Sequence, residues 1–116
     1  MTLIGEHAEI SRRLIQQADD EFRKGDTLQA SEKAWGAAAH ALKSIAEERG
    51  WRHGRHRDLF PVVKRIAEDT GQPEISLMFD AANTLHANFY ENWLPDDMVE
   101  DKIADVKDLL SRLESL

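Results

Sequence analysis

The sequence predicts an all-α protein, in which a single antiparallel bundle of about five helices spans residues 1–116. Apolar residues recur at spacings of three and four in five segments, which is the period of an amphipathic helix. Glycine, proline and capping residues separate these segments. No segment alternates apolar and polar residues as a half-buried strand does, and the length suffices for one domain with a buried core.

The first two helices are predicted on either side of the turn at residues 24–26. Asp26 and Gln29 have the spacing of a capping box, and the segment that follows to Arg49 is rich in alanine. Because its apolar residues cover more than half of the helix circumference, we expect the second helix to be the central, most buried one. The apolar stripe of the first helix consists of Leu3, Ile4, His7, Ile10, Leu14, Ala18 and Phe22.

Three further helices are predicted after the loop at residues 51–57. Asp58 is a plausible cap for a short helix, and a fourth helix is expected over residues 74–93. The last helix is predicted to begin at a capping box formed by Asp97 and Glu100. Its apolar residues have the spacing of a bundle seam and are Val99, Ile103, Val106, Leu110 and Leu113.

Composition excludes several classes of function. The chain has no cysteine, which rules out thiol catalysis and thiolate metal sites. Charged residues at the start and the lack of a long apolar stretch predict a cytoplasmic protein that does not contact membranes. The net charge of -7 argues against extensive nucleic-acid coating, although a local basic site remains compatible with it.

The loop that follows the second helix concentrates positive charge. Four arginines and two histidines lie between residues 49 and 57, together with a tryptophan. This composition is typical of a site that contacts phosphate or single-stranded nucleic acid. The alternative is a solvated turn in which the tryptophan covers the bundle end and the arginines pair with acidic neighbours. The candidate binding residues are Arg49, Trp51, Arg52, His53, Arg55, His56 and Arg57.

Histidines offer little support for a metal site in the sequence. His53 and His56 are close together, but zinc needs three or four ligands in fixed geometry, and no cysteine or dedicated carboxylate accompanies this pair. His7 and His40 have the pattern of ordinary residues on amphipathic helices. We therefore expect neither a metal nor a cofactor.

His86 is unusual because it lies in the middle of the apolar stripe of the fourth helix. A buried imidazole needs hydrogen-bond partners, and Asn83, Asn88 and Tyr90 are its natural companions. One interpretation is a core histidine bonded to a backbone carbonyl or a tyrosine. The other is a residue in a cleft or at a dimer seam, where it is the candidate for a catalytic role.

The polar strip of the second helix suggests a further contact. Gly36 lies in this strip, where glycine costs about 1 kcal/mol relative to alanine unless something packs close to the backbone. A partner helix would explain the glycine. If that helix belongs to a second copy of the chain, the strip faces a dimer interface, and we therefore expect a homodimer.

Three segments together resemble the HEPN superfamily and are most similar to its archaeal paralogous-repeat (PaREP) branch. They are Ala30 to Gly50, the pattern Gly50-Trp51-x-His53-x-x-His56-x-x-Leu59, and Leu85-His86-x-Asn88-Phe89-Tyr90-Glu91. The resemblance implies an antiparallel bundle of four or five helices that usually dimerises. Members of the superfamily act as metal-independent RNases in toxin systems or as non-catalytic partners of small nucleotidyltransferases.

The RNase motif of that superfamily is incomplete here. It has an arginine and a histidine separated by four to six residues, near the start of a late helix, where two protomers bring both copies into one cleft. The fourth helix has His86 but no arginine, while Arg49 and His56 match the spacing only within a loop. We therefore expect a homodimeric HEPN-like interaction module that contacts RNA, a nucleotide or a nucleotidyltransferase partner through the basic loop.

Two alternatives remain open at the level of sequence. The first is a metal-independent endoribonuclease of a toxin or defence system, although the chain has no nucleophile elbow and no glycine-rich phosphate loop. The second is a structural adaptor or a tetratricopeptide-like helical pair, for which the required repeats are absent.

Overall fold

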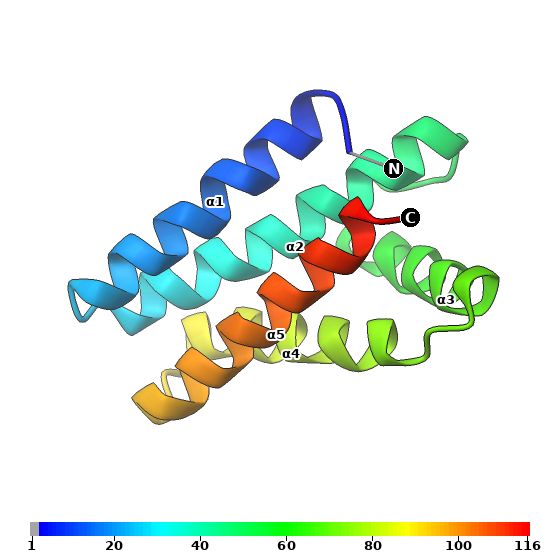
Figure 1. The fold of residues 1–116 in the computed structure, drawn as a ribbon. Coiled ribbons are helices and arrows are strands. Elements are labelled where there is room, and N and C mark those ends of the chain that lie inside the picture. The colour runs from blue at the N-terminus through cyan, green and yellow to red at the C-terminus, as the bar shows by residue number, and fades with distance from the viewer. Residues whose placement is uncertain (1–2) are drawn as a thin grey trace.

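The computed structural model describes residues 3–116, so that residues 1 and 2 of the predicted domain lie outside the described part. In Figure 1, α1 and α2 form one antiparallel hairpin, and α4 and α5 form another. The described residues contain no strand, and the prediction of an all-α bundle is confirmed. The elements are α1 (Glu6–Arg23), α2 (Thr27–Arg49), the 3-10 turn η1 (His56–Asp58), α3 (Leu59–Thr70), α4 (Glu74–Glu91) and α5 (Asp96–Glu114).

The predicted central position of α2 is confirmed. This helix contacts all four other α-helices, and its buried surface is mostly alanine. Alanine loses no side-chain entropy on burial and lets neighbouring helices approach closely. The buried alanines of α2 are Ala30, Ala34, Ala37, Ala38, Ala39, Ala41 and Ala46.

The partner helix expected at Gly36 is α1 of the same chain. A Cβ atom on Gly36 would lie 2.9 Å from Cδ1 of Leu14, which is closer than carbon atoms normally approach. The glycine thus permits the α1–α2 packing within one chain. This contact corrects the argument from sequence, because Gly36 no longer points to a second protomer.

Helix ends follow local chemistry, with three corrections. Asp26 caps α2 as predicted, since its side chain accepts a hydrogen bond from the backbone N–H of Gln29. Asp58 precedes α3 but accepts from the backbone N–H of Arg55, so it closes η1 instead of capping α3. α4 ends at residue 91, two residues before the end predicted from the sequence at residue 93. The capping box predicted at the start of α5 does not form, because Pro95 precedes the helix there and lacks a side-chain acceptor.

Asn88 fixes the corner between α4 and α5. Its side chain is 1% exposed, and its Oδ1 accepts hydrogen bonds from the backbone N–H groups of Trp93 and Leu94 at 3.0 and 2.9 Å. Its Nδ2 donates to Oγ of Ser31 on α2 at 3.1 Å. Both polar atoms are engaged, so Asn88 is not available to a ligand in this structure. These bonds give Asn88 a structural role at this corner, and its predicted role in binding stays a prediction.

The chain start and the last helix are tied together by polar contacts. The backbone N–H of Leu3 donates to Glu114 at 2.8 Å, and Arg12 donates to the same carboxylate at 2.7 Å.

None of the described helices has the length and apolar character needed to span a membrane.

Replacing Asn88 with alanine is expected to lower the free energy of unfolding by about 2 to 4 kcal/mol, because two partly buried N–H groups would lose their acceptor and Ser31 would lose its donor. Urea unfolding monitored by circular dichroism measures this change. Thr84→Ala on the same helix is the matched control, since that hydroxyl bonds only to the preceding turn. A loss at Asn88 no larger than that of the control would contradict the assigned role.

Candidate functional site

The loop after α2 sends its two histidines to different neighbours. His53 lies near His7 of α1, with ring centres 5.9 Å apart, whereas His56 lies against Trp35 of α2 at 4.4 Å. The backbone between them is extended at Arg55, with φ of -120° and ψ of 155°. The two residues are therefore parts of separate clusters.

His56 belongs to a group of rings that we call the aromatic–histidine cluster. His86 stacks on Trp35 with ring centres 4.8 Å apart, and His56 meets His86 edge-on at 5.3 Å. Phe60 stacks on His56, and Tyr90 meets His86 edge-on at 5.5 Å. The cluster consists of Trp35, His56, Phe60, His86 and Tyr90, which come from α2, η1, α3 and α4.

His86 is only partly buried and has a charged partner. Its Nδ1 lies 2.7 Å from Oε1 of Glu32 on α2, and the two side chains are 26% and 30% exposed. The expected partner, a backbone carbonyl or a tyrosine hydroxyl, is thus corrected to Glu32, while Tyr90 contacts His86 through its ring. A carboxylate accepts hydrogen bonds, so Nδ1 donates, and Nε2 has no hydrogen-bond partner within residues 3–116.

His56 is oriented in a similar way by Asn83. The amide nitrogen of Asn83 donates to the carbonyl of Phe79, which directs its Oδ1 toward Nε2 of His56 at 2.8 Å. Since an amide oxygen only accepts, Nε2 of His56 donates, and Nδ1 has no hydrogen-bond partner in the described part of the chain. Each imidazole of the cluster therefore has one nitrogen held by a partner and one able to accept a proton or contact a ligand.

Glu32 was missed by the sequence analysis, as was the role of Trp35. Both lie on the same face of α2, three residues apart, where their spacing is that of ordinary helix residues. Only the packing of α4 against α2 brings His86 to them. The spacing within α2 shows that Glu32 and Trp35 share a face, but it does not show that His86 contacts them.

Trp51 covers part of the core, as the alternative interpretation of the basic loop proposed. It is half-buried, and the guanidinium carbons of Arg49 and Arg65 lie 5.2 and 4.5 Å from its ring centre. These distances are typical of cation–π contacts. Arg65 belongs to α3 and was not among the predicted residues.

Of the other arginines of the loop, one forms an ion pair with a carboxylate of the described residues and two do not. Arg55 lies 3.6 Å from Asp58, whereas Arg52 and Arg57 are exposed and form no ion pair within residues 3–116. Burial raises the pKa of Asp58, but the hydrogen bond from Arg55 and the charges of Arg55 and Arg52 outweigh it, so this pKa lies below its usual value. Asp58 thus remains ionised at neutral pH and offsets part of the loop charge.

The loop and α3 also enclose a surface cavity of about 390 Å³. It is lined by Trp51, Arg52, Asp58, Pro61, Val62 and Arg65.

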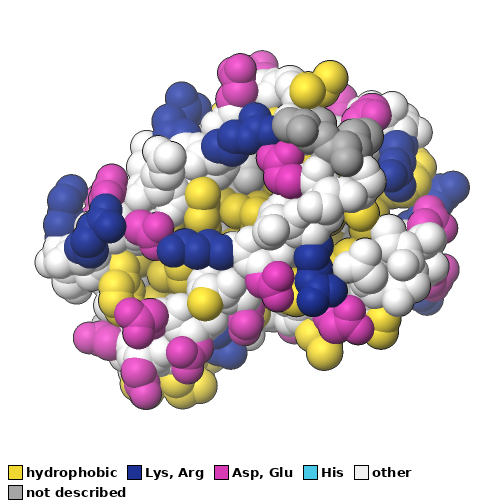
Figure 2. Space-filling view, viewed as in Figure 1, with side chains coloured by type: hydrophobic (Ala, Val, Ile, Leu, Met, Phe, Trp, Pro, Cys, Tyr) yellow, Lys and Arg dark blue, Asp and Glu magenta, His cyan; other side chains and the backbone are white. Residues whose placement is uncertain are grey.

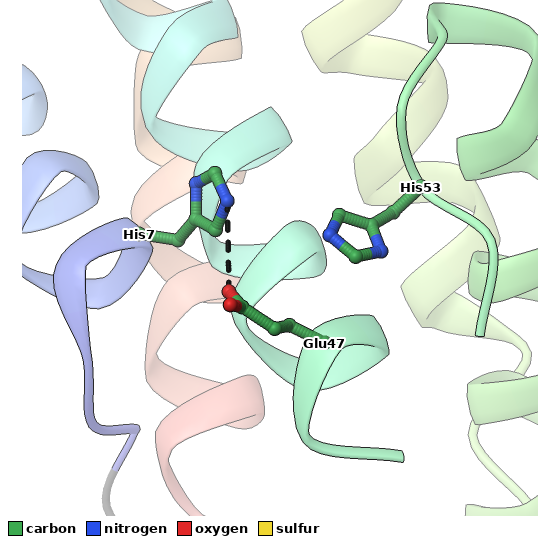
Figure 3. A group of neighbouring side chains, drawn as sticks. All are labelled: His7, Glu47 and His53. Atoms are coloured by element: carbon green, nitrogen blue, oxygen red, sulfur yellow. Dashed lines mark ion pairs between the residues drawn. The ribbon is translucent and has the colours of Figure 1, made fainter. Parts of the chain in front are cut away.

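A second group of side chains joins α1, α2 and the loop. Nδ1 of His7 lies 2.9 Å from Nδ1 of His40, and Nε2 of His7 lies 3.6 Å from a carboxylate oxygen of Glu47 (Figure 3). Nδ1 of His53 lies 2.7 Å from the carbonyl oxygen of Trp51. Donor atoms of His7, Glu47 and His53 all lie within 4.8 Å of one another, a spacing from which a metal ion could be bound.

His40 is a partly buried imidazole of this second group. Burial, followed by the positive charges of Lys43 and His7, lowers the pKa of His40 below its usual value. The imidazole is therefore neutral at pH 7 and can accept a hydrogen bond from His7. In the sequence, His7 and His40 have the pattern of ordinary helix residues, because only the contact between α1 and α2 brings them together.

Charge is mixed over the face of the molecule shown in Figure 2. Lysine and arginine side chains alternate there with aspartate and glutamate, and small apolar areas lie between them. This face has no extended basic patch. The net charge of -7 means that the field of the whole protein does not attract anions, so a contact with an anion requires a local group of basic side chains.

Comparison with known proteins gives a family and a structural neighbour. The structure is similar to a crystal structure of a protein from Sulfolobus solfataricus, with a TM-score of 0.79 and 27% identity over 95% of both chains. No curated protein matches the sequence significantly. The model of the archaeal PaREP1/PaREP8 family matches residues 6–110, which confirms the PaREP part of the predicted resemblance, while membership of the HEPN superfamily stays a prediction. The chain belongs to the archaeal PaREP1/PaREP8 family.

Proposed function

We propose that this protein binds single-stranded RNA through the aromatic–histidine cluster and the adjacent arginine-rich loop. The observation that carries the proposal is the position of His56, which belongs to the loop and contacts both Trp35 and His86. Cationic side chains and aromatic rings thus adjoin one another. This is the combination that proteins use to bind unpaired nucleotides.

The exposed rings of the cluster supply surfaces for base stacking. Phe60 is 50% exposed and Tyr90 is 70% exposed, although both contact imidazoles of the cluster. A large exposed ring held by a neighbour is preorganised for stacking, since little side-chain entropy remains to be lost. The free nitrogens of His56 and His86 can then form hydrogen bonds with base edges or phosphate oxygens.

The unpaired arginines supply the electrostatic part of binding. Arg52 and Arg57 are exposed in the loop, while Arg55 is already paired with Asp58. Since the protein as a whole is acidic, the attraction is local and should fall steeply with salt concentration.

The double variant Arg52→Ala/Arg57→Ala is expected to bind an oligouridine probe more weakly. The slope of log K against log salt should flatten by about 1.4, because each phosphate contact to a single strand contributes about 0.7. Fluorescence anisotropy at several salt concentrations measures the slope. The control Arg23→Ala/Lys24→Ala removes the same charge at the far end of α1, and an equal effect there would assign the loop arginines to solvent.

Replacing Tyr90 with alanine is expected to weaken binding of the same probe about fivefold or more, since loss of one stacked base costs about 1 to 3 kcal/mol. The slope with salt should not change. Leu77→Ala, which removes another exposed apolar side chain of α4, is the control. Equal affinities of the Tyr90 variant and the control would remove the cluster from the binding surface.

A second candidate function, metal-independent RNA cleavage, is favoured by the arrangement of His56 and His86. Their rings lie 5.3 Å apart, and each is oriented by a polar partner, Asn83 or Glu32. One imidazole could remove the proton of a ribose 2′-hydroxyl while the other protonates the leaving 5′-oxygen. The hydrogen bond to Glu32 would hold the ring of His86 in a fixed orientation for this step.

Under this second proposal, His86→Asn should reduce cleavage of a mixed RNA pool in EDTA by about a hundredfold or more. The melting temperature should stay within a few degrees, because the imidazole is partly exposed. Glu32→Gln, which preserves the shape of the partner, should reduce the rate less than His86→Asn. If the unaltered protein does not cleave RNA without metal, the cleavage function is excluded. The RNA-binding proposal is tested separately, by the binding measurements on the loop-arginine and Tyr90 variants.

A further inference from the structure

We propose that His7, Glu47 and His53 form a binding site for a divalent transition metal ion such as Zn²⁺. This site lies apart from the aromatic–histidine cluster and differs from the expectation based on sequence, which paired His53 with His56. The structure separates that pair and gives His53 two new neighbours from α1 and α2. Two imidazoles and a carboxylate are a ligand set that zinc accepts.

The distances are close to those of a coordinated ion. Nε2 of His7 and Oε2 of Glu47 are 3.6 Å apart, and all three donor atoms lie within 4.8 Å of one another. Zinc–nitrogen bonds of about 2.0 to 2.1 Å in a tetrahedron place neighbouring ligands roughly 3.3 Å apart. A small movement of side chains is therefore enough to complete the geometry. Glu47 can make this movement because its side chain is 64% exposed.

Hydrogen bonds orient both imidazoles toward the site. A carbonyl oxygen can only accept, so Nδ1 of His53 donates to Trp51, and Nε2 keeps its lone pair. Figure 3 shows a ring nitrogen of His53 directed toward His7. In His7, Nδ1 is held by His40, which leaves Nε2 facing Glu47. Metal-binding histidines commonly have such a partner on their second nitrogen.

The charges around the three residues also suit a cation. Glu47 has no lysine or arginine partner within residues 3–116, and its contact there is with His7. The carboxylate is therefore free to offset part of the ion charge. Imidazole ligands favour zinc and related transition metals over Mg²⁺ and Ca²⁺, which prefer oxygen. The partly exposed position leaves room for water as a fourth ligand.

Binding would join three segments that are distant in sequence. His7 lies in the first turn of α1, Glu47 in the last turn of α2, and His53 in the arginine-rich loop. An ion held by all three would bind the folded chain in preference to the unfolded chain. The consequence is a metal-dependent gain in stability that does not require RNA.

The test uses the full chain without an affinity tag, dialysed against EDTA and then against metal-free buffer. Competition with a chromophoric chelator should show one equivalent of Zn²⁺ per chain. At free zinc about 100 times the Kd, the melting temperature should rise on the order of 10 °C. EDTA should reverse this rise, and Mg²⁺ should not produce it.

Two variants identify the ligands. His53→Gln and Glu47→Gln should each weaken zinc binding about tenfold or more and reduce the thermal shift. The matched control His56→Gln changes a histidine of the same loop that faces the other cluster, so it should bind zinc as the unaltered protein does. Failure to bind zinc, or affinities of both variants equal to that of the control, would overturn the proposal. The result is independent of RNA binding and cannot be confused with failure of the proposed function.

Discussion

Close packing against the alanine-rich surface of α2 is the constraint on which the rest of the structure depends. Alanines along this helix are fully buried and allow α1, α4 and α5 to approach it closely. Gly36 extends the same property to α1, where Leu14 occupies the space of a missing Cβ. A larger side chain at such positions would force the neighbouring helices apart. The positions of the candidate site residues on α1 and α4 depend on this packing.

The polar strip that remains on α2 contributes to the aromatic–histidine cluster and to the second group, which contains His7, His40, Glu47 and His53. Glu32 lies near its beginning and contacts His86, beside the neighbouring Trp35, whereas His40 and Glu47 lie further along and contact His7. The central helix therefore acts as a shared support. The strip expected to face a partner protein is instead largely occupied by contacts within the chain, and the homodimer implied by the HEPN resemblance stays a prediction.

The loop after α2 connects the two clusters. Its αL residue Gly50, with φ of 75°, ends the helix, and Trp51 then packs on the core with arginines over its ring. This anchoring fixes the loop close to the bundle, so that His53 and His56 each reach a different partner. The loop thus combines both interpretations made from sequence, since it covers the bundle end and still exposes Arg52 and Arg57.

The sequence by itself determined the elements of this protein, because helix periodicity and capping are local properties of neighbouring residues. It predicted the central α2, the cap at Asp26 and the basic loop. Tertiary structure alone decided that Asn88 is a buried corner residue, that Glu32 is the partner of His86, and that His53 meets His7. These contacts join residues far apart in the chain, and their geometry depends on how whole helices pack. Local spacing indicates which face of a helix is buried, but it does not show which residues of other helices meet that face.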